Sequence, residues 1–221
     1  MRYYELVQAI PEGSSSLCRM ALVARRLGYH GIVVCNRGTI WSEKAARNVS
    51  GMEIVSGSMV AIREPRAMRG QVSRLRNKTA FVAVDGLSEA MCRTAIEDPL
   101  VDALHPFDGF RLTVPYARMA RMNQVALTVD LSPLIWLRGG QRSRWLDLSR
   151  KNLQMARKFK IHLALTALPR SHLDLRGPRD LIALAMLAGM TADEAGQALE
   201  YPGKVAHLNC RHWQSPGVEL L

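Results

Sequence analysis

Short apolar runs alternate along this chain with longer segments in which apolar and polar residues mix. Runs that are apolar throughout are typical of parallel β-strands covered on both faces, because a strand with one wet face has a polar residue at every second position. The pattern predicts seven strands, at residues 3–10, 31–35, 52–62, 79–84, 101–104, 125–129 and 161–168.

The segments between these runs have the spacing and the end signals of helices. Serines at residues 14–16 open the first of them. Pro178 stands at the first turn of another, where its missing N–H group is not needed. Thr191 and Glu194 have the spacing of a capping box and predict a last, short helix. The helices before this last one, including the two just described, are predicted at residues 14–27, 65–78, 88–96, 115–122, 143–158 and 179–189.

Strands that are each followed by a helix or a helical turn require a parallel sheet with right-handed crossovers. About seven or eight such units in a row usually close into a barrel, and 221 residues is at the small end for one. An open, doubly wound sheet is the alternative, and no glycine-rich phosphate-binding sequence supports it. We therefore predict a single α/β domain with a TIM-barrel-like fold over residues 1–221.

The balance of charge is the unusual part of the composition. Thirty cations stand against nineteen anions, which gives a formal net charge of +11, and the cations are twenty-four arginines and six lysines. Arginine is preferred where phosphates are bound by two parallel hydrogen bonds or where bases are stacked. The excess favours a polyanionic partner, with nucleic acid ahead of a membrane. A merely solvated basic surface, or an arginine-rich coding bias, is the alternative.

Cysteine use and the first residues indicate the compartment. The four cysteines are far apart, with no Cys-x-x-Cys pair, so reduced and buried thiols are expected rather than a zinc or redox site. The chain shows no apolar core of a signal peptide and no run long enough to span a membrane. We expect a cytoplasmic protein.

Several segments carry a resemblance to a known family. They are LRGPRDL at residues 175–181, ARKFKI at 156–161, LAGM at 187–190, LGYHGIVV at 27–34, and residues 98–106 and 125–129. These segments, in the order in which they lie along the chain, resemble the third protein component of archaeal ribonuclease P and its eukaryotic relative, a subunit of nuclear RNase P and RNase MRP. The resemblance extends from Tyr3 to about Asn209.

The resemblance implies a TIM-barrel-like subunit of the ribonucleoprotein that removes 5′ leaders from precursor tRNA. It implies that the RNA subunit performs the hydrolysis with Mg²⁺ and that this chain binds no cofactor. The chain would bind and stabilise the catalytic RNA together with a small α/β partner protein, as a heterodimer or heterotetramer. The other implied partners are further RNase P proteins and, indirectly, precursor tRNA, but no membrane.

The sequence also offers candidate residues for metal chemistry. In a barrel, the residues that end the strands share one rim, and here they are Gln8, Asn36, Asp85, His105, Asp130 and Thr166. Two aspartates and a histidine suit a divalent metal. The alternative function is therefore a stand-alone metal-dependent phosphoesterase of the polymerase-and-histidinol-phosphatase class.

That class carries a His-x-His pair at the end of its first strand, whereas this chain has ELVQ at residues 5–8. We therefore predict no metal ligand and no catalytic residue, and expect His105 to hydrogen bond locally.

Three basic clusters are the predicted RNA-binding sites. Gly139 and Gly140 are expected in a flexible loop beside Trp136, which offers a stacking surface unless it is a core residue. Asp180 is a candidate ion-pair partner for an arginine of the third cluster. Solvated helix faces are the alternative for all three clusters. The predicted contacts are Arg66, Arg69, Arg74, Arg76 and Lys78 in the first basic cluster, Arg138, Arg142, Arg144, Arg150 and Lys151 in the second, which runs on to Lys160, and Arg176 and Arg179 in the third.

Overall fold

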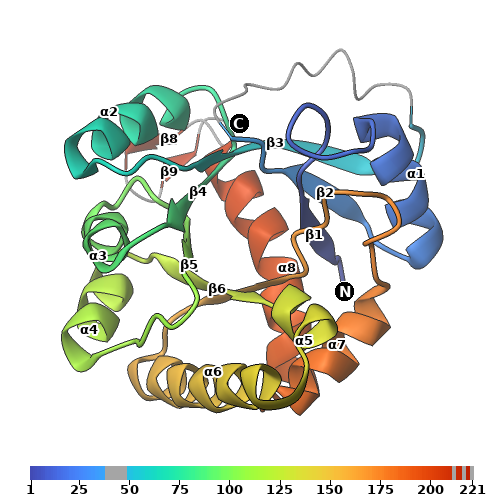
Figure 1. The fold of residues 1–221 in the computed structure, drawn as a ribbon. Helices are drawn as coiled ribbons and strands as arrows, with labels where there is room; N and C mark the ends of the chain where they lie inside the picture. Colours follow the sequence, from blue (N-terminus) through green and yellow to red (C-terminus); the bar gives the residue numbers. More distant parts are fainter. Residues whose placement is uncertain (38–48, 211–212, 216–217, 220–221) are drawn as a thin grey trace.

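The computed structural model describes residues 1–37, 49–210, 213–215 and 218–219. Its centre is a seven-stranded sheet in which the strands follow chain order and all pairs are parallel (Figure 1). The sheet curls into a nearly closed barrel, so the predicted TIM-barrel-like α/β fold and its seven strands are confirmed. The strands are β1 (Tyr4–Val7), β2 (Gly31–Val34), β3 (Glu53–Val60), β4 (Phe81–Gly86), β5 (Ala103–Pro106), β6 (Ala126–Asp130) and β7 (Leu163–Thr166).

Most helices of the described residues pack around the outside of this barrel (Figure 1). Three of them correct the sequence prediction: α5 was not expected, α6 begins at Gly139 rather than at residue 143, and α8 is 18 residues long instead of short. The helices are α1 (Leu17–Leu27), α2 (Pro65–Arg76), α3 (Glu89–Glu97), α4 (Val114–Met122), α5 (Ser132–Trp136), α6 (Gly139–Phe159), α7 (Pro178–Leu187) and α8 (Ala192–Asn209). A short antiparallel pair, β8 (Trp213–Ser215) and β9 (Val218–Glu219), follows α8.

The seam between the first and last strands is closed by side chains. Among the described residues the ladder ends at β1 on one side and at β7 on the other. The buried carboxylate of Glu5 bridges them, because it accepts hydrogen bonds from the Thr166 hydroxyl and from the Ala167 N–H at 3.0 Å. The Tyr29 hydroxyl lies 2.8 Å from the same carboxylate and 2.9 Å from the Arg176 carbonyl, and its proton can be donated to either acceptor. The LGYHG and LRGPRDL segments therefore meet at this seam.

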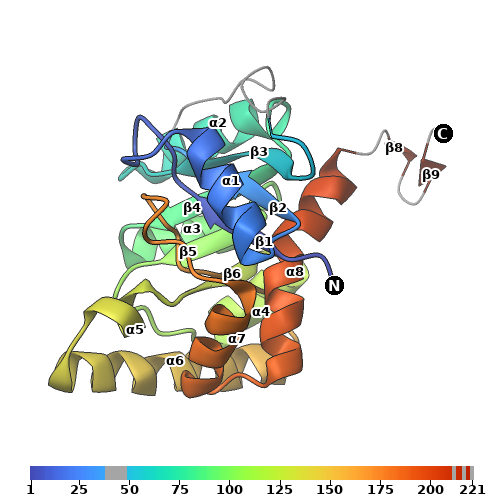
Figure 2. The ribbon, with the colours of Figure 1, turned by 90° about the vertical axis from the view of Figure 1, so that its right-hand side faces the viewer.

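Helix α8 covers the amino-terminal end of the barrel (Figure 2). Asn209 donates to the carbonyl of Ala80 at 2.9 Å, just before β4 begins. The ring of Tyr4 lies between Gly31 and Gly203, where an added Cβ would lie 2.4 and 2.2 Å from the ring carbons. Only glycine lets the strand and the helix approach the ring this closely. With this end covered, the opposite end of the barrel is the one that carries open loops.

The core has two layers. A cluster that includes Leu6, Met59 and Phe81 fills the inside of the barrel. Two larger clusters of apolar residues pack between the sheet and the surrounding helices. No helix within the described ranges combines the length and the apolar character needed to cross a bilayer.

Candidate functional site

The carboxyl-terminal ends of the strands surround a hollow of about 520 Å³, the barrel mouth. Its lining includes three of the rim residues expected from the sequence, Asp85, His105 and Asp130. It also includes Arg37 and Arg170, which the sequence did not single out. The sequence did carry a signal for both, because Arg37 comes a few residues after β2 and Arg170 a few residues after β7. Residues just after barrel strands are the ones that reach this rim.

Several polar groups in the mouth and in the loops around it bind one another. A guanidinium nitrogen of Arg37 lies 2.6 Å from a carboxylate oxygen of Asp85. Arg170 Nε donates to Gln8 Oε1 at 2.9 Å, and Gln8 is fully buried. Asn36 exchanges two hydrogen bonds with the backbone of Ala9, at 2.8 and 3.0 Å. These pairs hold the loops of the mouth in place.

A second set of polar residues in the mouth, around Asp130 and His105, includes atoms that lack hydrogen-bond partners. Asp130 accepts from the N–H and the hydroxyl of Ser132, both at 2.8 Å, and burial raises the pKa of its carboxyl while the nearby His105 opposes the shift. His105 Nδ1 is buried without a hydrogen-bond partner, contrary to the expected local bond. The buried hydroxyl of Thr128 also has no partner. Buried polar atoms without partners are uncommon and mark a place where another molecule can bind.

The residues in the described ranges contain no group of three His, Cys, Asp or Glu side chains placed to hold a metal ion. Two cysteines, Cys35 and Cys92, are buried thiols. Burial raises the pKa of Cys92 to about 11 and that of Cys35 still further.

The second basic cluster lies on α6, and the helix divides it into two stripes. The outer stripe, Arg144, Lys151 and Lys158, is exposed, with spacings of seven residues that keep it on one face. Within it, Lys151 forms a surface ion pair with Asp147 at 2.6 Å. Such an exposed pair is weak and leaves the lysine available to a phosphate.

The inner stripe, Arg150 and Arg157, faces the end of α7. Arg150 donates to the Leu187 carbonyl at 3.2 Å. Arg157 donates to the Gly189 carbonyl at 2.6 Å and makes two bonds of 2.7 Å to Glu194. Cations are favourable at a helix carboxyl end because they face its free carbonyls. The inner stripe thus joins α6 to α7 and α8.

Arg157→Ala should lower the free energy of unfolding by about 1–2 kcal/mol, because it removes both hydrogen bonds of Arg157 to Glu194 and its bond to the Gly189 carbonyl. Urea unfolding measures the loss. The control is Arg144→Ala, which removes the same charge from an exposed position of the same helix and should change stability by less than about 0.5 kcal/mol. Equal losses in the two variants would contradict the division into stripes.

The predicted flexible Gly139–Gly140 loop is wrong, because these residues form the first turn of α6. Arg138 donates to the Ile135 carbonyl at 3.0 Å, and Arg142 Nε donates to the Leu137 carbonyl at 2.8 Å. These bonds satisfy carbonyls at the end of α5 and allow α6 to follow at once. Trp136 is 65% exposed, which excludes a core role and leaves its indole on the surface of the mouth.

The first basic cluster lies on and just after α2, which α3 and α4 separate from α6 around the barrel (Figure 1). Arg66, Arg74 and Lys78 are exposed. Arg69 forms an ion pair with Glu97 at 3.1 Å. The side chain of Arg76 is only 16% exposed and lies 2.7 Å from Asp102, so its guanidinium links α2 to the start of β5. The first and second clusters therefore face different sides of the molecule.

The third basic cluster is at the start of α7. Asp180 accepts from the Gly177 N–H at 3.2 Å and so caps the helix. Arg176 donates to the carbonyls of Leu173 and Leu175, both at 3.0 Å. In the described structure Asp180 pairs with neither Arg176 nor Arg179, so the expected ion pair is wrong. Arg179 is exposed.

These features define a class: a basic TIM-barrel-like protein with arginine-rich helix faces. A solved structure of histidinol phosphate phosphatase from Lactococcus lactis, complexed with zinc, L-histidinol and phosphate, has a similar fold. Its TM-score is 0.57 at 11% identity, covering 88% of this chain and 94% of that one. A chain in the cryo-EM structure of archaeal ribonuclease P with mature tRNA is more similar, with a TM-score of 0.81 at 20% identity and 98% coverage of both chains.

Sequence similarity identifies the family. The model of RNase P subunit p30 matches residues 2–214. Ribonuclease P protein component 3 of Methanococcoides burtonii is 34% identical over 225 residues, covering 99% of this chain and 93% of that protein. The corresponding protein of Methanosarcina mazei is also 34% identical, over 92% of this chain and 87% of its own. The chain belongs to the RNase P subunit p30 family, as its motifs indicated.

Proposed function

We propose that this chain is a protein subunit of ribonuclease P that binds and stabilises the RNA which removes 5′ leaders from precursor tRNA. The match to the RNase P subunit p30 family over residues 2–214 carries the proposal. The charge of +11 supports it, because neutralising phosphates lets RNA helices approach one another. The RNA would perform the hydrolysis with Mg²⁺, and this chain would supply no catalytic residue and no cofactor.

The exposed cations are the proposed RNA contacts. Since the first and second basic clusters lie on different sides of the barrel, they would bind separate RNA segments rather than one continuous strand. Other members of the predicted set also bind inside the protein, which gives Arg69, Arg76, Arg138, Arg142, Arg150 and Arg176 a structural role as well. The contacts that we favour are Arg66, Arg74, Lys78, Arg144, Lys151 and Arg179.

A small α/β protein of the same ribonucleoprotein is the proposed direct partner, in a heterodimer or heterotetramer. Co-purification of the two chains in the absence of RNA tests this pairing.

Reconstitution tests the function. With the cognate RNA and the small partner protein, adding this chain should lower the Mg²⁺ concentration needed to cleave precursor tRNA, because its cations replace part of the ionic screening that folds the RNA. Cleavage rates over a Mg²⁺ titration, with and without the chain, give the result. An unchanged Mg²⁺ requirement would count against the proposal.

The control in that experiment is the protein without RNA, which should not cleave. The fold likeness to histidinol phosphate phosphatase favours a metal-dependent phosphoesterase as the second candidate. Against it, the Asp85 carboxylate is already bound to Arg37 and Asp130 to Ser132. Stoichiometric zinc or manganese in the purified protein, together with RNA-free cleavage, would establish the second candidate instead.

A further inference from the structure

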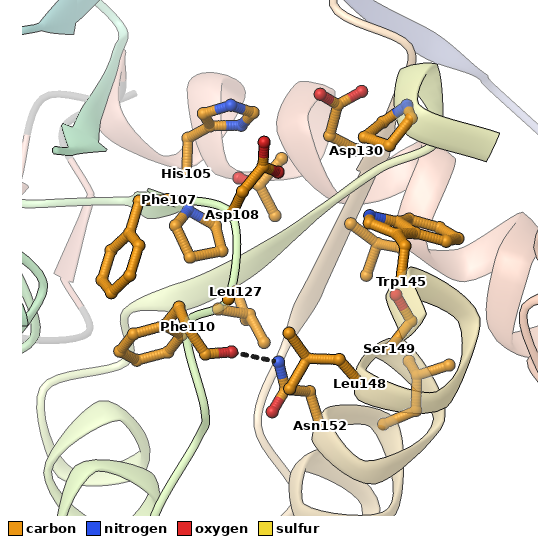
Figure 3. Close-up of a pocket in the computed structure, with 16 residues that line it drawn as sticks. His105, Phe107, Asp108, Phe110, Leu127, Asp130, Trp145, Leu148, Ser149 and Asn152 are labelled. Carbon is orange, nitrogen blue, oxygen red and sulfur yellow. Dashed lines mark hydrogen bonds between the residues drawn. The ribbon is translucent and has the colours of Figure 1, made fainter. Parts of the chain in front are cut away.

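A separate cavity of about 90 Å³ lies beside the barrel mouth, between β6, the loop after β5 and α6 (Figure 3). Phe107 and Phe110 form one wall and Trp145 the opposite one, while His105, Asp108 and Asp130 stand together at one end. About 10–15 Å³ of such space holds one water molecule, so this cavity has room for a flat ring system.

The walls of the cavity are held in place without a ligand. Asn152 on α6 donates to the Phe110 carbonyl and accepts from the Leu112 N–H, both at 2.9 Å. Its amide therefore fixes the loop after β5 against α6. Phe110 is further fixed by a T-shaped contact with Phe107 and a stacked contact with Tyr116. A preformed aromatic slot of this kind loses little entropy when a flat ligand enters.

The cavity also has unused hydrogen-bonding capacity. Thr128 is only 4% exposed, and its hydroxyl, like His105 Nδ1, has no partner. Both residues line the cavity. A buried polar atom without a partner is costly, and a ligand that bonds to it recovers that free energy. A flat ligand with polar edges therefore fits this slot.

Charge narrows the class of ligand. The carboxylates of Asp108 and Asp130 both line the cavity and would repel a phosphate, but they accept hydrogen bonds from N–H groups. The cavity shares His105, Asp108 and Asp130 with the mouth, where Arg37, Arg170 and the exposed indole of Trp136 lie. A nucleotide can therefore place its base inside and its phosphates outside.

We propose that this cavity binds one unpaired nucleobase of an RNA strand, stacked between the aromatic walls with its N–H edge toward Asp130. Guanine suits it best, because its Watson–Crick edge offers two adjacent N–H donors, and each oxygen of Asp130 keeps a second lone pair beside its bond to Ser132. The inference rests on the proposed function as an RNA-binding subunit and adds a base site to its phosphate contacts. It makes the barrel mouth a point at which the protein holds a single-stranded RNA position.

The test uses the full chain and short RNA strands of five nucleotides that carry a base only at the central position. A strand with central guanine should bind about tenfold more tightly than a fully abasic strand with the same phosphates, because stacking on aromatic side chains is worth roughly 1–3 kcal/mol per base. Fluorescence anisotropy of end-labelled strands measures both affinities. Guanosine monophosphate, tested in competition, separates a strand site from a site for free nucleotides.

Matched variants locate the base. Ser149→Leu places a larger side chain into the cavity from α6, and it should abolish the advantage of guanine while leaving the affinity for the abasic strand unchanged. Ser143→Leu makes the same change at an exposed position of the same helix and should leave the advantage intact. Thr128→Val keeps the side-chain shape, removes the unpartnered hydroxyl and should reduce the guanine advantage severalfold. If Ser149→Leu fails to fold, Thr128→Val tests the base site in its place.

The outcomes separate the two proposals. If both strands bind equally to the native chain, or if Ser149→Leu and Thr128→Val both keep the full guanine advantage, the base site is wrong and phosphate binding stands. If neither strand binds, the base site is wrong, and binding of the cognate RNA, measured alongside, decides separately whether the proposed RNA-binding function stands. If the free nucleotide binds as tightly as the strand, the cavity is a site for a mononucleotide and the assignment to an RNA strand is overturned.

Discussion

Glu5→Gln should raise the free energy of unfolding at pH 8 by roughly 3 kcal/mol and leave it almost unchanged at pH 4.5. Burial raises the pKa of Glu5 to about 7 from 4.5, although the bonds from Thr166, Tyr29 and Ala167 oppose the shift. Glutamine has the same shape, can accept from Thr166 and Ala167, and carries no charge at any pH.

The sign follows from proton binding. Between pH 4.5 and about 7 the folded protein keeps the proton of Glu5, whereas the unfolded chain has lost it. Folding therefore takes up a proton, and stability falls as the pH rises through this window. The stability that protonated Glu5 contributes is fully present below the pKa of this group in the unfolded chain. It is lost above the pKa of about 7 that the group has in the folded protein. The glutamine variant should show no such slope from this position.

Urea unfolding of both proteins at pH 4.5, 6, 7 and 8 measures the difference. The matched control is Glu53→Gln, at the start of β3. Burial raises the pKa of Glu53, but hydrogen bonds from Tyr4 and His207 outweigh it and lower the pKa overall. Its charged form is the stabilised one, so Glu53→Gln should destabilise the protein at pH 7. A Glu5→Gln variant less stable than the native protein at pH 8 would contradict the prediction. It would show that the seam favours the charged form of Glu5.

Removing two exposed cations from α6 should weaken RNA binding by roughly 25- to 60-fold at about 0.1 M salt. In the double variant Arg144→Ala with Lys151→Ala, each lost phosphate contact should reduce the slope of log K against log salt by about 0.7–0.9. The total loss of slope is therefore about 1.4–1.8 units. The melting temperature should not change measurably, because both side chains are exposed.

The matched control removes two charges from the same helix at Arg150 and Arg157. These cations bind the Leu187 and Gly189 carbonyls, so their loss should lower the melting temperature and reduce the salt slope less. Binding of the cognate RNA at several salt concentrations and thermal unfolding give the two readouts. If Arg144→Ala with Lys151→Ala keeps the native affinity and salt slope, the outer stripe is only a solvated surface.

The order of strands and helices could be predicted from the sequence because it depends on local composition. Strands buried on both faces must be apolar throughout, so β4 and β6 were visible as runs. The capping box of α8 was visible as well, and the structure confirms both of its bonds, between Thr191 and Glu194 at 2.8 and 3.2 Å. The parallel barrel then followed from the alternation of elements.

The length of α8 was decided by tertiary contacts. Pro202 lies inside this helix, where proline removes a hydrogen bond and usually ends the helix. Here it is buried, and the neighbouring Gly203 packs directly against the ring of Tyr4. Packing against the barrel therefore outweighs the local preference, which no sequence pattern could indicate.

The functional site is likewise determined in part by the sequence and in part by the tertiary structure. The sequence by itself determined the basic charge, the family motifs and the lack of a His-x-His pair at the end of β1. Only the tertiary structure separated Arg144, which faces solvent, from Arg157, which binds Glu194. It alone placed Thr128 and Trp145 around one cavity. The physical reason is that charge and periodicity belong to a segment, whereas the role of a side chain depends on groups that folding brings to it from distant positions.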